Sequence, residues 1–138
     1  MKKILLPLDG TDRSLNTITW IQKNFKKNDV ELYLITVLED FDFVSSVEEA
    51  EEMKEKMNQK LKEFADLLEG YYVKFISILG RAGKDIVDFA ESNDVNMIVM
   101  TKSTRPGWVK ILGSVTTYVV QHAKCDVMII SEKYDSKL

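Results

Sequence analysis

The sequence predicts an α/β fold in which a parallel sheet is covered by helices on both faces. Short apolar segments alternate with longer amphipathic segments along the chain, and this alternation is typical of parallel α/β sheets. The short segments are continuously apolar, which indicates strands that are buried on both faces. With 138 residues, the chain fits one domain spanning residues 1–138.

The first half of the chain begins with a strand, a helix and a second strand. Residues 3–8 (KILLPL) form an apolar segment that ends at an Asp-Gly turn. A helix with Thr11 or Asp12 as its N-cap is expected next, because four apolar residues recur at helical spacing: Leu15, Ile18, Ile21 and Phe25. Residues 31–38 (ELYLITVL) are rich in β-branched and aromatic residues and predict the second strand.

A long helix, a third strand and a shorter helix are expected in the middle of the chain. The long helix ends near Gly70, and its apolar stripe consists of Val47, Ala50, Met53, Met57, Leu61, Phe64 and Leu68. Residues 72–79 (YVKFISIL) predict the third strand. The shorter helix follows Gly80, and three of its residues are expected to face inward: Ile86, Phe89 and Ala90.

The last third of the chain supplies two more strands and one helix. Residues 95–101 (VNMIVMT) predict the fourth strand, and residues 126–131 (DVMIIS) predict the fifth. The last helix is expected over residues 114–122, after a polar loop. The final residues, EKYDSKL, are polar and are expected to fray.

Composition and charge argue against several classes of protein. The formal net charge of −3 gives no electrostatic reason to expect nucleic acid or an anionic membrane as a partner. The single cysteine excludes an intramolecular disulfide. The apolar run at the start stops at Pro7 and Asp9, unlike a secretory signal, and no apolar run approaches the ~20 residues that span a bilayer. We therefore expect a soluble, cytoplasmic protein.

One edge of the predicted sheet is the expected ligand site. Doubly wound sheets bind ligands beyond the carboxyl ends of their strands, where the strand order reverses. The first and fourth strands are expected to flank that point, so the loops that begin at Asp9 and Thr101 are the candidates. The second loop ends in Gly113-Ser114 at a helix start, where free N–H groups can hold an anion, and it carries three cations: Lys102, Arg105 and Lys110.

Four segments of the chain, in this order, match the pattern of a known family. They are KILLPLDGTDRS, LITVLED, GRAGKDIVDFAESNDVNMIVM and ILGSVTTYVVQHAKCDVMII. Through them the sequence resembles the universal stress protein family over essentially its whole length. The resemblance implies a Rossmann-like, adenine nucleotide alpha hydrolase-like fold with a five-stranded parallel sheet in the order 3-2-1-4-5. It also implies a homodimer and a role in stress survival and regulation, usually without catalysis.

The resemblance also bears on the loop after the fourth strand. Some members of the family bind ATP through the pattern G-x-x-G-x9-G-[ST], and others have lost it. Here the first two glycines fall at Thr101 and Thr104, and eight residues rather than nine separate Thr104 from Gly113. Glycine permits positive φ and close approach to a phosphate, whereas a left-handed threonine is strained by about 1 kcal/mol or more. The loop is therefore expected to be a damaged nucleotide site or one rebuilt for another ligand.

The resemblance implies a site for ATP, with magnesium, assembled from three parts of the chain. The candidate residues are Pro7, Asp9, Val37, Thr101, Thr104, Gly113, Ser114, Val115 and Thr116. Asp9 would lie by the ribose, and the backbone of Val37 would face the adenine. Simpler interpretations stay open, since Asp9 can close an Asx-type turn, Val37 can be a core residue, and Ser114 can be an N-cap.

Three other residues invite chemical interpretations. Trp108 can pack over a helix, close a ligand site or meet a partner. His122 and Cys125 have no partner at metal-ligand spacing, so helix-end capping and burial are expected for them, with no metal site and no catalytic residue. The three loop cations are either a solvated surface or a phosphate clamp.

Two functions follow from these observations. The leading hypothesis is a dimeric stress-response and regulatory module, with unknown protein partners, in which nucleotide binding is weakened or lost. The alternative is an adenine-nucleotide-binding protein that uses a modified loop over residues 101–116, with at most slow hydrolysis. An ATP pyrophosphatase is disfavoured because LDGTDRS lacks the first Ser-Gly of SGGxDS. A receiver domain is disfavoured because the third strand ends without an aspartate, and P-loop and dinucleotide motifs do not occur.

The last predicted strand is the expected dimer contact. At a sheet edge, the segment Asp126 to Ser131 would expose apolar side chains and unpaired backbone groups. Pairing with a second copy across a twofold axis would cover both. Asp126 stands where members of the family often have proline, so the pairing is expected to begin one residue differently.

Overall fold

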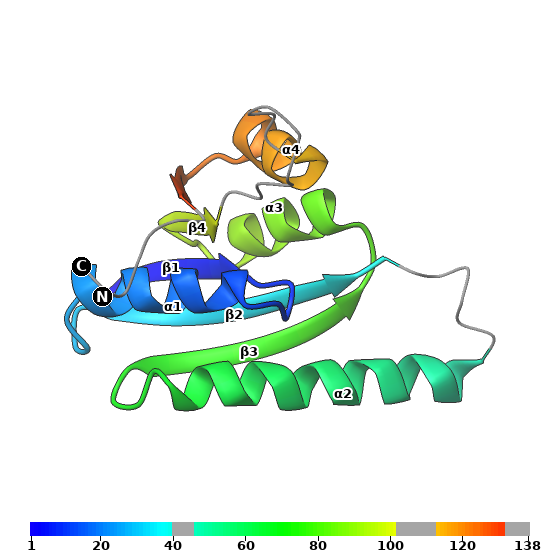
Figure 1. Cartoon of the computed structure of the whole chain (residues 1–138). Helices are drawn as coiled ribbons and strands as arrows, with labels where there is room; N and C mark the ends of the chain where they lie inside the picture. Colours follow the sequence, from blue (N-terminus) through cyan, green and yellow to red (C-terminus); the bar gives the residue numbers. More distant parts are fainter. Residues whose placement is uncertain (40–45, 102–112, 132–138) are drawn as a thin grey trace.

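The computed structural model describes residues 1–39, 46–101 and 113–131, which form five strands and four helices (Figure 1). The strands are β1 (Lys2–Pro7), β2 (Val30–Leu38), β3 (Tyr72–Leu79), β4 (Met97–Thr101) and β5 (Asp126–Ile130). The helices are α1 (Arg13–Asn24), α2 (Val47–Asp66), α3 (Ala82–Ser92) and α4 (Ser114–His122). Each predicted element is present, with strand bounds that differ from the prediction by two residues at most.

The strands form one parallel sheet in the order β3-β2-β1-β4-β5. This order confirms the predicted fold class. The chain winds outward from β1 to β3 and then returns to β4 on the other side of β1, so the order reverses between β1 and β4. The carboxyl ends of these two strands therefore lie side by side.

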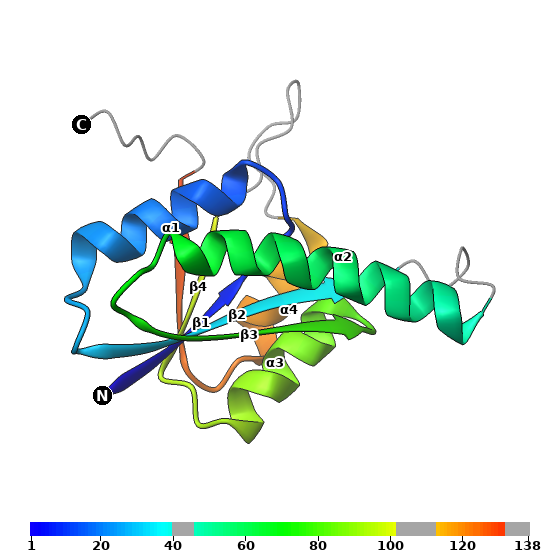
Figure 2. The ribbon, with the colours of Figure 1, turned by 90° about the horizontal axis from the view of Figure 1, so that it is seen from below.

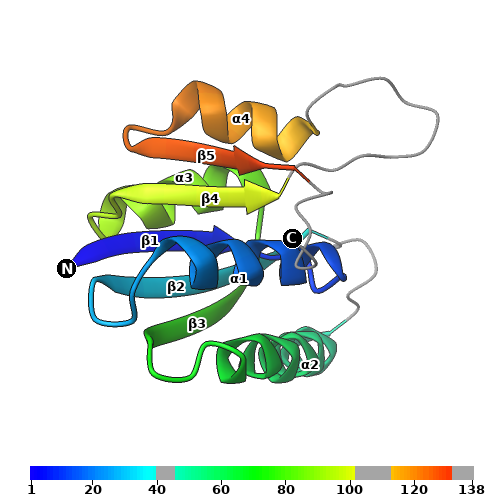
Figure 3. The same cartoon turned by 60° about the vertical axis from the view of Figure 1, so that its left-hand side comes forward.

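Helices cover both faces of the sheet (Figure 3). One apolar cluster packs α1 and α2 against the sheet and includes Leu6, Ile18 and Leu61. The other packs α3 and α4 against the opposite face and includes Leu5 and Ile86. Successive residues of a strand point to opposite faces, which is why Leu5 and Leu6 belong to different clusters and why the strands are continuously apolar.

Two apolar stripes are less buried than the sequence predicts. Leu15 is exposed, and α1 instead buries Ser14, Thr17, Ile18 and Ile21. Burial on α2 is confined to its C-terminal half, since Val47 is 79% exposed. The first turns of α2 extend past the carboxyl ends of the strands (Figures 1 and 2), so no sheet lies beneath them.

The start of α4 also differs from the prediction. Gly113 occupies the N-cap position and Ser114 is the first helical residue, so Ser114 is not the cap. The peptide N–H of Thr117 donates to the carbonyl of Gly113 at 2.9 Å, which closes the first turn. None of the helices in the described ranges has the length and apolar character that crossing a bilayer requires.

Candidate functional site

The two candidate loops begin at the same edge of the sheet. β1 pairs with both β2 and β4, so Asp9, just after β1, and Thr101, the last residue of β4, follow neighbouring strands. Residues 102–112 lie outside the described residues. Of the predicted site they include Thr104, together with the loop cations and Trp108.

Asp9 closes the turn between β1 and α1. Its Oδ1 accepts hydrogen bonds from the peptide N–H of Thr11 at 2.9 Å and from the Thr11 hydroxyl at 2.6 Å. The Ser14 hydroxyl lies 3.4 Å from the same oxygen. Gly10 takes a φ of +81°, a conformation that glycine adopts without strain. The Asx-type turn is confirmed, and it fixes the carboxylate at the edge of the sheet.

Arg13 binds the other oxygen of this carboxylate. Its Nη2 atom lies 2.5 Å from Asp9 Oδ2, and the Arg13 and Asp9 side chains are 33% and 45% exposed. Burial raises the pKa of the Asp9 carboxyl, but hydrogen bonds from Thr11 and Arg13 outweigh it and leave the pKa below its ordinary value. Asp9 is thus an ionised acceptor at neutral pH. Arg13 was not among the residues predicted for this site, because a spacing of four residues indicates an ion pair only within a helix, and Asp9 lies before α1 begins.

Thr101 is held by a contact with α1. Its Oγ1 lies 2.7 Å from Oγ1 of Thr17, a buried residue. Asp94 is the one non-glycine residue with positive φ in the described part of the chain, so Thr101 has no left-handed conformation. The strain expected for a left-handed threonine does not arise here, because Thr101 continues the extended backbone of β4.

Val37 lies where β2 continues beyond β1. The last pair between these strands is Pro7 with Ile35, and the peptide N–H of Leu8 donates to the Ile35 carbonyl at 2.8 Å. Backbone groups alternate along a strand, so those of Val37 face the same side as those of Ile35, past the end of β1. Its side chain packs against the cluster beneath α3 and α4. The core interpretation of Val37 is therefore correct for the side chain, while its backbone lies at the edge of the sheet that holds the candidate site.

The first turn of α4 presents both polar and apolar groups. Gly113 and Ser114 are exposed, Val115 packs against the core and Thr116 is buried. The first N–H groups of a helix have no partner within the helix, and they attract anions. This end of α4 retains the chemistry expected of a phosphate contact, but the Thr116 side chain faces the core.

The N-terminus of α3 is already occupied by carboxylates. Glu39, just after β2, accepts a hydrogen bond from the peptide N–H of Ala82 at 2.6 Å. Asp85 accepts one from the peptide N–H of Arg81 at 2.8 Å. Glu39 is separated from Ala82 by 43 positions, so sequence periodicity could not identify this cap. Negative charge at this helix start disfavours a phosphate there.

His122 ends α4, and Cys125, for which burial was expected, is only partly buried just before β5. His122 Nδ1 lies 2.9 Å from the carbonyl oxygen of Tyr118, and the two rings stack at 4.0 Å, which confirms helix-end capping. Cys125 is half-buried, and burial raises the pKa of its thiol. Across the described ranges, no three His, Cys, Asp or Glu side chains are grouped to hold a metal ion.

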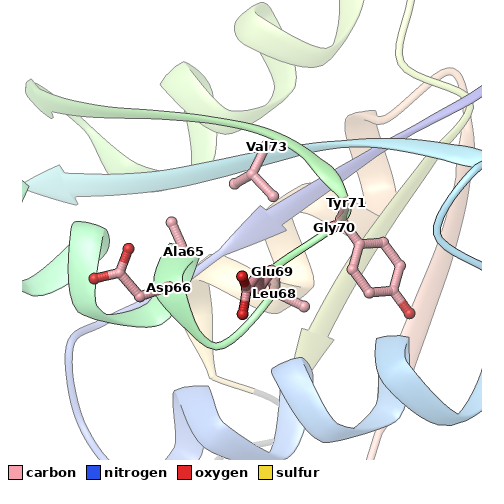
Figure 4. A pocket seen from close by; sticks show the side chains of 7 residues that line it. All are labelled: Ala65, Asp66, Leu68, Glu69, Gly70, Tyr71 and Val73. Carbon is pink, nitrogen blue, oxygen red and sulfur yellow. The ribbon is translucent and has the colours of Figure 1, made fainter.

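A hollow lies away from this edge, at the turn between α2 and β3 (Figure 4). It is lined by Ala65, Asp66, Leu68, Glu69, Gly70, Tyr71 and Val73. Its lining combines apolar side chains with two carboxylates and contains no cation. Helices run antiparallel to the strands they connect, so this turn lies at the amino-terminal edge of the sheet, opposite the candidate site.

Comparisons with known proteins agree with this geometry. The model of the Universal stress protein family matches residues 1–131. Universal stress protein MJ0531 of Methanocaldococcus jannaschii is 32% identical over 140 residues, which cover 95% of this chain and 82% of that protein. The structure of protein MJ0577 superposes with a TM-score of 0.73 at 29% identity, covering 94% of this chain and 95% of the other. That of protein PH0823 gives 0.79 at 25% identity with the same coverage.

More distant proteins with this fold have been solved with adenine nucleotides bound. They are a universal stress protein in complex with cAMP (18% identity, TM-score 0.71), one from Archaeoglobus fulgidus with dAMP (20%, 0.67) and one from Arabidopsis thaliana with AMP (17%, 0.67). The chain covers 97% or more of each of these three proteins. At these identities the likeness concerns the fold.

Proposed function

The chain belongs to the universal stress protein family, and from this premise we propose that it is a dimeric regulatory protein of the stress response whose adenine-nucleotide site binds ATP weakly or not at all. The site is the sheet edge at the carboxyl ends of β1 and β4, between Asp9 and the start of α4. The protein acts through contacts with partner proteins and not through catalysis.

The contact between Thr101 and Thr17 is the observation that carries this proposal. Thr101 stands at the end of β4, where the ATP-binding pattern has its first glycine, and its hydroxyl is engaged 2.7 Å from that of Thr17. A glycine would leave the backbone open to close approach by a phosphate. The threonine adds a β-carbon, a methyl group and a hydroxyl that is already hydrogen-bonded to Thr17 on α1. Each of these groups opposes the approach of a phosphate.

A second candidate function is retained adenine-nucleotide binding, with magnesium and at most slow hydrolysis. It is supported by the exposed Gly113-Ser114 start of α4 and by the backbone of Val37 beyond the end of β1. The complexes of related folds with cAMP, dAMP and AMP support the same ligand class. In this case the modified loop would hold the phosphates without the two lost glycines.

Isothermal titration of the purified protein with ATP and magnesium, and then with AMP, separates the two functions. The proposed function predicts no saturable binding of ATP below the millimolar range, and a clear gain in the double variant Thr101→Gly, Thr104→Gly. The variant Thr17→Val is the matched control, because it breaks the same hydroxyl contact but keeps the side chain at position 101. It should show no gain.

Micromolar binding by the unmodified protein would contradict weakened binding and support the second candidate. The second candidate also predicts that the two glycines change the affinity little. A phosphate-release assay on a protein that binds would then test for slow hydrolysis.

A further inference from the structure

We propose that Arg13 restrains the carboxylate of Asp9. This restraint lowers the affinity of the candidate site, at the carboxyl ends of β1 and β4, for the ribose of a nucleoside. The inference rests on the proposed function, because it takes the edge beside Asp9 as the adenine-nucleotide site. It identifies a residue outside the phosphate loop that determines how strongly the site binds.

Both oxygens of the Asp9 carboxylate are engaged. Oδ1 accepts two hydrogen bonds from Thr11, at 2.9 and 2.6 Å. Oδ2 lies 2.5 Å from Nη2 of Arg13 in a charge-assisted hydrogen bond. Thr11 therefore orients the carboxylate without help from Arg13, while Arg13 takes the second oxygen.

A ribose would compete for that second oxygen. The vicinal hydroxyl groups of a ribose are hydrogen-bond donors, and an ionised carboxylate is an acceptor with room for more than one donor on each oxygen. Asp9 lies at the end of β1, beside the point where the strand order reverses and where ligands of doubly wound sheets bind. A hydroxyl that reaches Oδ2 must displace the guanidinium of Arg13 or share this oxygen with it.

The exposure of the pair indicates that a ribose hydroxyl can compete with Arg13 for the carboxylate. The Arg13 and Asp9 side chains are 33% and 45% exposed, and ion pairs of this exposure contribute little to stability. Removing the guanidinium should therefore leave the fold intact. Because the Asx-type turn through Thr11 remains, the freed carboxylate should keep its orientation at the edge.

The test compares Arg13→Gln with the unmodified protein by titration with adenosine, which has a ribose but no phosphate. We expect Arg13→Gln to bind adenosine about tenfold more tightly, the effect of gaining one hydrogen bond to a charged group. Binding of 2′,3′-dideoxyadenosine, which lacks both hydroxyl donors, should stay the same. In Arg13→Lys, which keeps the charge, most of the restraint should remain.

Two further variants serve as controls. Lys84→Gln removes a cation from another i,i+4 pair, with Asp88 on α3, and should not change adenosine binding. Adding Asp9→Asn to Arg13→Gln should abolish the gain, because an amide NH2 group, which is a donor, then replaces the freed carboxylate oxygen. A denaturation curve of each variant checks that it is folded.

The outcomes separate this inference from the proposed function. Unchanged or weaker adenosine binding by Arg13→Gln overturns the restraint, even if the unmodified protein binds ATP as weakly as proposed. An equal gain with the dideoxy compound also overturns it, because Arg13 would then obstruct the site without acting through Asp9. Micromolar ATP binding by the unmodified protein overturns weakened binding, while the adenosine ratio still tests Arg13.

Discussion

At the scale of single residues, the close approach of two helices depends on a glycine, which has no side chain. Gly83 lies in the first turn of α3 and is buried against the ring of Tyr118 on α4. A β-carbon at Gly83 would lie 2.8 Å from Cγ and Cδ1 of that ring, closer than packed carbon atoms approach. The glycine therefore allows α3 and α4 to meet.

Replacing Gly83 by alanine tests this contact. Alanine favours a helix by about 1 kcal/mol over glycine, but overpacking costs about 1–3 kcal/mol, so we expect a net loss of stability in urea denaturation. Combining Gly83→Ala with Tyr118→Ala should remove the penalty, because the obstructing ring is gone. If Gly83→Ala is equally destabilising in both backgrounds, the contact with Tyr118 is not its cause.

The candidate site was only partly predictable from its residues. Asp9 could be found because an Asp-Gly pair after an apolar strand is a local turn signal. The contact between Thr17 and Thr101 joins positions 84 apart, and no local pattern reports such a distance. Arg13 resembles any surface arginine in the sequence, because its contact with Asp9 depends on how the turn after β1 orients that carboxylate.

At the scale of elements, the sequence predicts the helices better than their surroundings. Helical spacing of apolar residues identified α1 and α2, yet Leu15 and Val47 are exposed. Periodicity shows which residues share a helix face, but not where the sheet beneath that face ends. The same limit applies to caps, since Ser46 caps α2 while Ser114 lies inside α4.

These two serines provide a matched pair of substitutions. The Ser46 hydroxyl accepts a hydrogen bond from the peptide N–H of Glu49 at 3.1 Å, so Ser46→Ala should destabilise the protein by about 1 kcal/mol. Ser114→Ala removes the same hydroxyl from an exposed first helical position and should change stability by no more than a few tenths of a kcal/mol. Chemical denaturation of both variants measures the difference, and a larger loss for Ser114→Ala would contradict the assignment of the caps.

At the scale of the whole molecule, the alternation of strands and helices was enough to predict the sheet. The strand order came from the family resemblance, because apolar strands alone do not specify their neighbours. The resulting sheet has two edge strands, β3 and β5, and both carry exposed apolar side chains. Composition does not indicate which of the two edge strands forms the dimer contact, so the proposed contact through β5 needs a direct comparison between them.

Matched lysine substitutions on the two edges provide that comparison. Met128 at the centre of β5 is 39% exposed, and Ile76 on β3 is 41% exposed. Antiparallel pairing of β5 with a second copy would bring the two Met128 side chains near the twofold axis, where two lysines would repel each other. Light scattering during gel filtration should thus give twice the chain mass for the unmodified protein and for Ile76→Lys, but the mass of a single chain for Met128→Lys.

Two outcomes would contradict this prediction. Dissociation by Ile76→Lys alone would instead assign the contact to β3, and a monomeric unmodified protein would refute the dimer. Both positions are exposed in the single chain, so a change in mass would report association and not unfolding.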